Sequence, residues 1–387
     1  MKNILKMIEK LFKMRKLIKI IKGIYLGGNN YMNNKLFWYL YNLFKPLKYL
    51  LSFSNKVRID DQLSYNLEPM FIEPKRIEFY VKTPYKKSHN TSNTINWRGL
   101  ELKKFPKLNK NNIFNELNAG SLYKSIQHNG FKSQKDLGIN NNDDEVKAAI
   151  DQNGKYILIN GFNRLEISKV LSLQKVPIII VSRHPKWLKF KREIYIYSQE
   201  QPQGVYQQII HPDFQHLTFH RKSDKRWGII KDNLPIKQGS LLDIGSNWGY
   251  FCHKFEDLGF SCTAIEKNYR WGYYLKKLRE IENKSFKIII DSIFNIDNPK
   301  YDIVLALSIF HGFMREKKLY EMLTEYLKII DMKYMFFEPH VEHELERGYY
   351  KQYNPDEFID YIIENTCLSK SKYLGESNRG RKIYLLS

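Results

Sequence analysis

The sequence has few of the features that mark disulfide-rich, zinc-binding or membrane-spanning proteins. Its 387 residues include three cysteines, Cys252, Cys262 and Cys367, and no two of them form a Cys-x-x-Cys pair. The sequence therefore predicts neither a disulfide framework nor a cysteine-based zinc site, and it favours a protein of the reducing cytoplasm. No run of about 18 uninterrupted apolar residues is present, so no transmembrane helix is expected.

Positive charge is abundant but unevenly placed. The chain carries 63 Lys and Arg against 41 Asp and Glu, a net charge of +22. Residues 221–387 hold 27 of these basic and 24 of these acidic residues, which leaves a net charge of +19 in residues 1–220. The basic half favours an anionic partner such as a membrane, a nucleic acid or a phosphorylated glycan. The alternative is coding bias, because Lys, Asn and Ile are frequent throughout.

The first 55 residues read as a basic amphipathic helical segment. Apolar residues of the first 22 positions recur at helical spacing, and lysines fall largely on the other face. An aromatic-rich stretch follows at residues 36–51. Such a segment can lie on an anionic membrane surface, which would make the protein peripheral to the membrane. It can equally pack on the rest of the protein, because most globular helices are amphipathic.

After Gly239, short apolar runs alternate regularly with amphipathic segments. This alternation predicts a parallel sheet covered by helices on both faces, and the last two runs predict an antiparallel hairpin. The strands are expected at residues 240–244, 262–266, 286–290, 301–307, 334–338, 370–375 and 382–386. Helices are expected at residues 248–258, 269–281, 316–329 and 355–365.

The most specific motif lies where the first of these strands meets its helix, in Leu-Leu-Asp243-Ile-Gly245-Ser-Asn247-Trp-Gly249-Tyr. Glycines in such a turn allow a ligand to approach the backbone and leave the helix N-terminal amides free to bind it. Glu266 ends the second strand, where a carboxylate can accept hydrogen bonds from two ribose hydroxyls. Asp291 follows the third strand, close to the expected place of an adenine. Three strand ends therefore converge on one nucleoside-shaped ligand.

The motif is not the Gly-x-Gly-x-x-Gly of dinucleotide-binding proteins. It resembles the first motif of class I S-adenosylmethionine-dependent methyltransferases, an acidic residue followed by Gly-x-Gly-x-Gly, over roughly residues 225–387. The resemblance implies that Asp243, Gly245 and Gly249 border the methionine moiety of S-adenosylmethionine. Asn247 stands where the family has its middle glycine, and Asn tolerates backbone conformations that are closed to most residues.

Methyl transfer to an oxygen requires a group that removes the acceptor's proton. His311 follows the fourth strand and is the candidate general base, because a neutral imidazole titrates in a suitable range. The alternative is that it only shapes its loop. Glu338, at the end of the fifth strand, is the candidate for orienting His311 or binding substrate hydroxyls. Trp248 either lines the methionine pocket or packs in the core.

A second strand–turn–helix unit lies at residues 155–181, within a region expected to begin near residue 56. Its turn, Asn160-Gly161-Phe162-Asn163-Arg164, and the later Val176-Pro177 strand resemble the ParB/sulfiredoxin-like domain, which carries Asp-Gly-x-His-Arg. Asn160 and Asn163 replace two of those five residues. A glycine turn at a helix N-terminus beside an arginine suits a phosphate group, so Gly161, Asn163 and Arg164 are candidate phosphate-binding or nucleotide-binding residues.

Two further expectations concern the flanks of this unit. Residues 146–151 are expected to close a helix. Trp187 follows in a basic run, where it either stacks on a base or a sugar or packs beneath a helix.

These patterns predict an α/β protein with three parts: a basic helical segment (1–55), a smaller α+β ParB-like domain (56–205) and a Rossmann-like methyltransferase sheet of seven strands (206–387). The favoured function is O-methylation of a sugar, a glycan or another small hydroxylated acceptor. One alternative is a nucleic-acid methyltransferase whose basic half docks on the nucleic acid. No Asp/Asn-Pro-Pro-Tyr/Phe tetrapeptide follows the fourth strand, which weighs against base methylation. A non-enzymatic nucleotide-binding or DNA-binding module is the other alternative.

Overall fold

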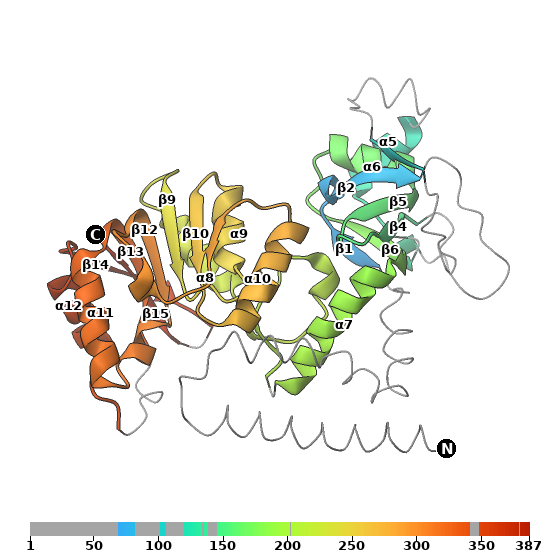
Figure 1. The fold of residues 1–387 in the computed structure, drawn as a ribbon. Coiled ribbons are helices and arrows are strands. Elements are labelled where there is room, and N and C mark those ends of the chain that lie inside the picture. The colour runs from blue at the N-terminus through green and yellow to red at the C-terminus, as the bar shows by residue number, and fades with distance from the viewer. Residues whose placement is uncertain are drawn as a thin grey trace, which may run out of the picture.

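A computed structural model describes residues 69–81, 101–105, 120–133, 135–137, 145–201, 203–340, 348–378 and 380–387. Two sheets, joined by a connector at residues 201–239, dominate these ranges (Figure 1). The expected amphipathic segment of residues 1–55 lies outside them, so its contact with a membrane stays a prediction. Within the described ranges, no helix is both long enough and apolar enough to cross a bilayer.

The N-terminal region, residues 69–200, is built on a mixed six-stranded sheet of order β1-β6-β4-β5-β2-β3. Its strands are β1 (Met70–Ile72), β2 (Ile77–Val81), β3 (Leu102–Lys104), β4 (Lys147–Ile150), β5 (Tyr156–Asn160) and β6 (Val176–Arg183). Its helices are α5 (Gly120–Asn129), α6 (Phe162–Val170) and α7 (Pro185–Glu200). The strand, glycine turn, helix and strand expected at residues 155–181 are therefore present.

The expectation that residues 146–151 close a helix is wrong. Lys147–Ile150 forms β4, which pairs with β5 on one side and with β6 on the other. Ala148, Ala149 and Ile150 are completely buried there. The run is short, so its local preference is weak, and pairing with two neighbouring strands decides its conformation.

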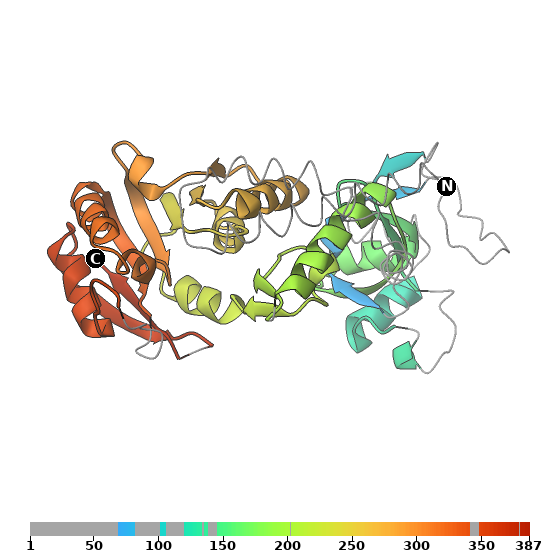
Figure 2. The ribbon, with the colours of Figure 1, turned by 60° about the horizontal axis from the view of Figure 1, so that its bottom comes forward.

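The connector carries little regular structure but makes many contacts. It holds the two short strands β7 (Val205–Gln207) and β8 (Phe219–Arg221), which pair in parallel, and the helix α8 (Asp224–Asp232). Figure 2 shows α7 and α8, in green and yellow-green, running between the two sheets. Val205, Ile209 and Phe214 are buried in the core of the N-terminal region, so the connector is packed rather than loose.

The C-terminal region, residues 240–387, contains a seven-stranded sheet of order β11-β10-β9-β12-β13-β15-β14. The strands are β9 (Ser240–Ile244), β10 (Ser261–Ile265), β11 (Lys287–Ile289), β12 (Lys300–Leu307), β13 (Asp331–Glu338), β14 (Ser371–Glu376) and β15 (Lys382–Leu386). The helices are α9 (Tyr250–Asp257), α10 (Tyr269–Ile281), α11 (Lys317–Ile329) and α12 (Pro355–Glu364). β9 to β13 run parallel, and β15 is antiparallel to β13 and β14.

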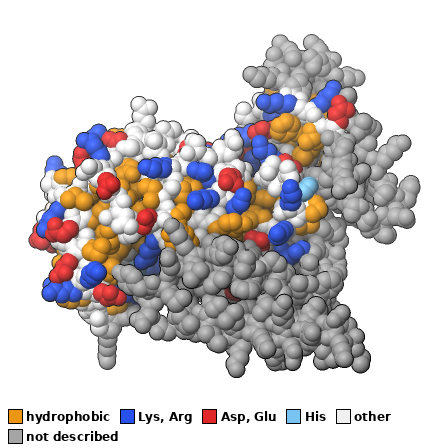
Figure 3. Space-filling model, in the orientation of Figure 1, with side chains coloured by type: hydrophobic (Ala, Val, Ile, Leu, Met, Phe, Trp, Pro, Cys, Tyr) orange, Lys and Arg blue, Asp and Glu red, His pale blue; other side chains and the backbone are white. Residues whose placement is uncertain are grey.

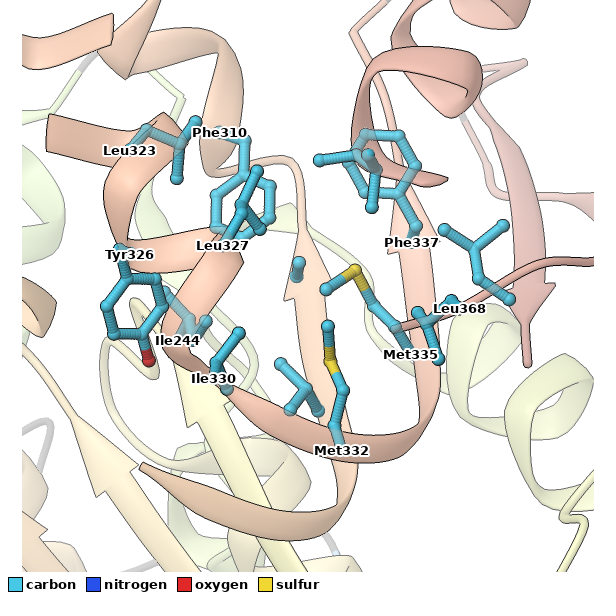
Figure 4. Packing of buried hydrophobic residues seen from close by; sticks show 14 of the residues in the cluster. Ile244, Phe310, Leu323, Tyr326, Leu327, Ile330, Met332, Met335, Phe337 and Leu368 are labelled. Atoms are coloured by element: carbon cyan, nitrogen blue, oxygen red, sulfur yellow. The ribbon is translucent and has the colours of Figure 1, made fainter. Parts of the chain in front are cut away.

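Alternation along the strands divides the core of this sheet into two layers. Leu242 and Ile244 of β9 face α11 and α12, together with Met335 and Phe337 of β13 (Figure 4). Leu241, one position earlier, faces α8, α9 and α10 on the other side. Figure 1 shows α11 and α12 on one side of the sheet and α9 and α10 on the other. The parallel strands are thus buried on both faces, and their carboxyl ends form the edge at which ligands bind in such folds.

The two regions share one hydrophobic cluster. Trp187 and Tyr197 of α7 belong to the same buried cluster as Trp248, Tyr274 and Leu278 of the C-terminal region. An ion pair between Arg76 and Glu282, with 2.9 Å between Nη2 and Oε2, adds to this junction. On the face shown in Figure 3, basic and acidic side chains of the C-terminal region are interspersed, in keeping with its small net charge.

Candidate active site

The turn between β9 and α9 has the conformation that its glycines suggest. Gly245, Asn247 and Gly249 all have positive φ angles, of 69°, 52° and 82°. Asn247 thus occupies a left-handed conformation that glycine and asparagine tolerate best. The amides of Gly245 and Ser246 both donate to the carbonyl of Ile265, at 3.0 Å. The turn is therefore tied to the end of the neighbouring strand β10.

Glu266, the residue after β10, lies directly against this turn. Its Oε2 accepts a hydrogen bond from the amide of Asn247 at 3.0 Å, and its Oε1 accepts one from the amide of Asn268 at 2.8 Å. The residue is only 4% exposed, and this burial raises the pKa of its carboxyl to about 7. Each carboxylate oxygen has two lone pairs, so each retains one for a further donor.

Asp243 is a second buried carboxyl near the same turn. Burial raises its pKa to about 7, and the negative charge of Glu266 acts in the same direction. The thiol of Cys252 donates to its Oδ2 at 3.8 Å. Two carboxyl groups with raised pKa values at the end of adjacent strands are typical of functional sites.

Several buried polar atoms of the turn have no hydrogen-bond partner within the described ranges. They are the Oγ of Ser246 and both side-chain atoms, Oδ1 and Nδ2, of Asn247. Asn247 is 2% exposed. Buried polar groups are nearly always paired, so unpaired ones concentrated in one turn call for a missing polar partner. These atoms and the carboxylate of Glu266 fit the polar groups of an S-adenosylmethionine molecule.

The amides at the start of α9 are expected to be free, and for Tyr250, the first residue of the helix, that expectation is wrong. The amides of Trp248 and Tyr250 both donate to Oε1 of Gln207, at 3.1 Å and 3.2 Å. Gln207 comes from β7 in the connector and is itself buried. Gln207 was not predicted from the sequence. Nothing in the local pattern indicates that a glutamine will accept the amide of a residue 43 positions later.

The structure answers the open question about Trp248. Its ring packs between Tyr197 of α7 and Tyr274 of α10, with centroid distances of 5.4 Å and 4.8 Å. Trp248 therefore packs at the junction of the two regions. The turn thus contacts the N-terminal region through the ring of Trp248 and the connector through Gln207.

Asp291 lies two residues after the edge strand β11 and is exposed. Its Oδ1 accepts hydrogen bonds from the amide of Ser292 at 2.7 Å and from Nδ2 of Asn295 at 2.9 Å. β11 and β10 are neighbours, and the carbonyl of Ile289 accepts the amide of Glu266. Asp291 and Glu266 thus lie at the carboxyl ends of adjacent strands.

The loops after β12 and β13 bring a second polar group to the same edge of the sheet. The hydroxyl of Ser308 donates to Oε2 of Glu338, and Nη2 of Arg226 lies 3.1 Å from the same oxygen. Glu338 is 1% exposed, and its Oε1 has no hydrogen-bond partner within the described ranges. Ser308 has a φ of +56°, a strained conformation for serine, and the hydrogen bonds of its amide and hydroxyl to Glu338 hold it there.

Arg226 was missed by sequence analysis, since α8 precedes the sheet and carries no motif. Besides pairing with Glu338, its positive charge acts to lower the pKa of Asp243. It therefore lies between two acidic groups from different strands. His311, in the 3-10 turn Phe310–Phe313, is half-buried, and its ring centroid is 6.0 Å from that of His340.

Gly245 of the turn lies very close to the loop after β12. A Cβ on Gly245 would come within 2.8 Å of Cδ1 of Ile309. Ile309 begins the segment that carries His311. The structure thus brings the β9 turn and the start of the His311 loop into contact.

The candidate phosphate-binding turn of the N-terminal region has a different character. Gly161 has a φ of +89° and begins α6. The guanidinium of Arg164 donates to the carbonyl of Lys132, lies 3.9 Å from Glu145 and stacks over the ring of Phe131 at 4.5 Å. Asn163 is half-buried in the first turn of α6. Phosphate binding by Gly161, Asn163 and Arg164 stays a prediction.

Trp187 packs in the core, which decides between the two interpretations offered for it. It is 1% exposed, and its Nε1 donates to Oδ2 of Asp213 at 2.7 Å. Asp213 is also paired with Arg183 and with Lys191, whose Nζ is 2.9 Å from Oδ1. Burial lowers the pKa of Lys191 to about 8, whereas Lys191 and Arg183 hold the pKa of Asp213 well below its usual range.

No family model and no curated protein sequence matches the chain. Among solved structures, the bifunctional kinase-methyltransferase WbdD is 20% identical, with a TM-score of 0.41 over 50% of this chain and 46% of that chain. The chain thus matches less than half of the length of WbdD.

Two shorter methyltransferases are similar over a smaller part of this chain. Magnesium protoporphyrin IX methyltransferase from Synechocystis PCC 6803, solved with bound SAM, is 14% identical (TM-score 0.32; 42% of this chain, 76% of that chain). The N-methyltransferase NodS from Bradyrhizobium japonicum WM9 is 12% identical (TM-score 0.34; 42% of this chain, 92% of that chain).

Proposed function

We propose that the chain is an S-adenosylmethionine-dependent methyltransferase that methylates a hydroxyl group of a sugar, a glycan or another small acceptor. The observation that carries the proposal is the turn after β9. There, unpaired polar atoms of Ser246 and Asn247 adjoin the buried carboxylate of Glu266. This turn lies at the carboxyl edge of a sheet in which β15 runs antiparallel between β13 and β14, the strand arrangement implied by the methyltransferase resemblance.

In this proposal each residue of the turn has a separate task. Glu266 accepts the ribose hydroxyls with the lone pairs that its two backbone donors leave open. Asp291 lies beside the adenine, and Asp243, Gly245, Asn247 and Gly249 border the methionine part. The cofactor supplies a methyl group already activated on a sulfonium. The chain's own contribution is therefore to position the acceptor and to exclude water.

The polar residues after β12 and β13 are proposed to bind the methyl acceptor. Glu338 has one oxygen occupied by Ser308 and Arg226, and its Oε1 is the acceptor for a substrate hydroxyl. The nearby Arg226 compensates the charge of Glu338, so a neutral hydroxyl can bind there without burying a lone carboxylate. His311 removes the proton of the acceptor hydroxyl, and its side chain is accessible enough to release that proton to solvent.

The N-terminal region is proposed to bind a nucleotide or another phosphate-bearing molecule, in the manner of ParB-like domains. What supports this is the strand–glycine–helix turn at Gly161 with Arg164 in the first turn of α6. The engagement of Arg164 by Lys132 means that its guanidinium is held in place by the protein. Any phosphate bound there would have to share the guanidinium with that carbonyl.

The deciding experiment follows the methyl group. The purified chain is incubated with S-adenosylmethionine carrying a labelled methyl group and with fractions of a cell extract. We expect label in a carbohydrate or small-molecule fraction, and none with His311→Ala. Label in nucleic acid would replace the proposed acceptor by the nucleic-acid alternative. Absence of label in every fraction, together with no cofactor binding by calorimetry, would refute the enzyme.

A further inference from the structure

A cavity of about 470 Å³ lies where the N-terminal region, the connector and α9 meet. Its walls come from β1 and the turn that follows it, from the loop before β6, from the segment between β7 and β8, from β8 itself and from the start of α8 and α9. Small-molecule sites typically have volumes of roughly 300–1,000 Å³ and often form between domains. This cavity meets both criteria, and none of the residues assigned to methyl transfer lines it.

Four cationic side chains face the cavity from four separate elements. They are Arg76, Lys175, Lys222 and Lys254. Two acidic residues, Glu73 and Asp224, also line it. The lining therefore has an excess of positive charge, although the chain segments that supply it are far apart in the sequence. Such convergence is a property of the fold rather than of a local run of lysines.

The acidic residues of the lining are already engaged by neighbours. Asp224 accepts the hydroxyl of Tyr250 at 2.6 Å and Nε2 of Gln208 at 2.9 Å. Glu73 forms an ion pair with Lys75 at 3.1 Å. Neither carboxylate therefore lies in an ion pair with a lysine of the cavity.

The four cations of the lining differ in whether a carboxylate lies within ion-pair distance of them. Arg76 is paired with Glu282, which leaves its charge compensated. Lys175, Lys222 and Lys254, in contrast, have no carboxylate within ion-pair distance among the residues that the structure describes. Three cations without a carboxylate partner in the described part of the chain, gathered around one concave site, favour a ligand that carries more than one negative charge.

The remaining walls are apolar or aromatic, apart from Gln208 and Gln215. Phe71, Phe219 and Tyr250 line the cavity, and Phe71 is 54% exposed although it is a large apolar side chain. Phe219 is partly buried and Tyr250 is buried, so the exposed ring of Phe71 is the surface beside the cations on which a planar group can stack. The cavity thus combines a polyanion site with a site for a flat, apolar group.

We infer that this cavity binds a small diphosphate ester with a planar group, of which a nucleoside diphosphate is the simplest form. The diphosphate lies among Lys175, Lys222 and Lys254, and the planar group lies against the aromatic walls. The site is separate from the cofactor turn: Tyr250 presents its hydroxyl to the cavity wall, whereas its amide faces Gln207. The inference therefore does not depend on the proposed methyl transfer.

Calorimetric titration of the full chain with ADP and with inorganic pyrophosphate tests the inference. The test variant is the double charge reversal Lys222→Glu with Lys254→Glu. The matched control is Lys231→Glu with Lys237→Glu, which changes the net charge equally at exposed positions outside the cavity. We expect ADP affinity to fall at least about tenfold in the test variant and to change less than about twofold in the control.

Three results would overturn the inference: no ADP binding by the native chain at low salt, equal weakening in both double variants, or pyrophosphate binding as tightly as ADP. Equal weakening of ADP binding in both double variants would show that ADP is attracted unspecifically to a basic protein. Equal affinities for ADP and pyrophosphate would show that the planar group makes no contact with the cavity. Both double variants carry substitutions only at lysines that form no ion pair with another described residue, so we expect unchanged thermal unfolding. Titration of the same variants with S-adenosylmethionine distinguishes the cavity from the cofactor turn. Weaker ADP binding should leave the affinity for S-adenosylmethionine unchanged.

Discussion

Two strand–glycine–helix turns of this protein look alike and are built differently. Gly161 begins α6 with a φ of +89°, and Gly249 begins α9 with a φ of +82°. At the first turn, Oδ1 of Asn160 accepts the amide of Gly161, and Arg164 donates to Lys132. At the second turn, polar atoms of Ser246 and Asn247 have no partner in the described ranges.

The difference extends to the carboxyl groups around each turn. The buried Asp213 of the connector is paired with two cations and a tryptophan of the N-terminal region, and its pKa is held low. Near the second turn, burial raises the pKa of Asp243 and of Glu266 to about 7, and no cation of the described ranges lies in an ion pair with either one. Protein groups thus compensate the buried charge of Asp213, whereas the buried carboxyl groups near the second turn have no such compensation within the described ranges.

Removing Asp213 should produce the largest change in stability. Asp213→Ala leaves Arg183 and Lys191 buried without their shared partner, which typically costs about 3–5 kcal/mol. We expect this loss in the free energy of unfolding, measured by chemical denaturation. The exposed Asp232→Ala serves as the control and should change little. A small effect of Asp213→Ala would contradict the view that this region depends on its internal charge pairs.

Removing Glu266 should mainly affect ligand binding. Glu266→Ala deletes the carboxylate beside the turn, and hydrogen bonds to charged groups contribute about 1.5–3 kcal/mol. The affinity for S-adenosylmethionine, measured by calorimetry, should fall by about 10- to 100-fold. Glu280→Ala, on the exposed side of α10, is the matched control. If both variants bind equally well, Glu266 does not contact the cofactor.

The close approach at Gly249 can be separated from its backbone strain. A Cβ there would come within 2.5 Å of Cδ1 of Leu275, whereas a Cβ on Gly259 would meet nothing within 4 Å. Both glycines have similar positive φ angles, 82° and 91°. Gly249→Ala should therefore destabilise the protein by about 1–3 kcal/mol more than Gly259→Ala, in thermal or chemical unfolding. Equal losses would show that only the backbone conformation matters.

The raised pKa values predict a pH-dependent affinity for the cofactor. A carboxyl with a pKa of about 7 is protonated below that pH, and only the carboxylate can accept both ribose hydroxyls. Affinity should therefore rise by about tenfold from pH 6 to pH 8, since one pKa unit corresponds to about 1.4 kcal/mol. Glu266→Gln should flatten the profile. A steep profile that survives this substitution would assign the titration to another group.

Gln207 should have the smallest effect of the five. Gln207→Leu removes the oxygen that accepts the amides of Trp248 and Tyr250, and a neutral hydrogen bond contributes about 1 kcal/mol. We expect about fivefold weaker S-adenosylmethionine binding. Gln207→Glu retains an acceptor oxygen and should bind nearly as the native chain does. If the two variants are equally impaired, Gln207 acts through packing alone.

Much of the C-terminal sheet could be predicted from the sequence, because its signals are local. Strands buried on both faces are runs of apolar residues, and the amphipathic helices between them are long enough to recognise. β12 and α11 begin within a residue or so of the expected positions. β4 could not be predicted in this way, since Lys147–Ile150 is a strand only through its pairing with β5 and β6.

Some residues of the candidate site could likewise be predicted from the sequence, and others could not. The glycine turn, Glu266 and Asp291 could be found from the sequence, because each directly follows a strand and parallel strands end at one edge. Gln207, Arg226 and Ser308 could not be found. Each acts on a residue 30 or more positions away, and no local pattern encodes such a contact.

The sequence by itself determined the strands and helices of the C-terminal sheet and where the chain can turn sharply, since hydrophobic periodicity and glycine act over a few residues. Only the tertiary structure decided which polar groups are satisfied. The pairing of Asp213 with Arg183, the capping of α9 by Gln207 and the cavity lined by three separate lysines all join distant parts of the chain. Burial and charge compensation depend on those contacts, because a side chain finds its partners only after distant segments have been brought together.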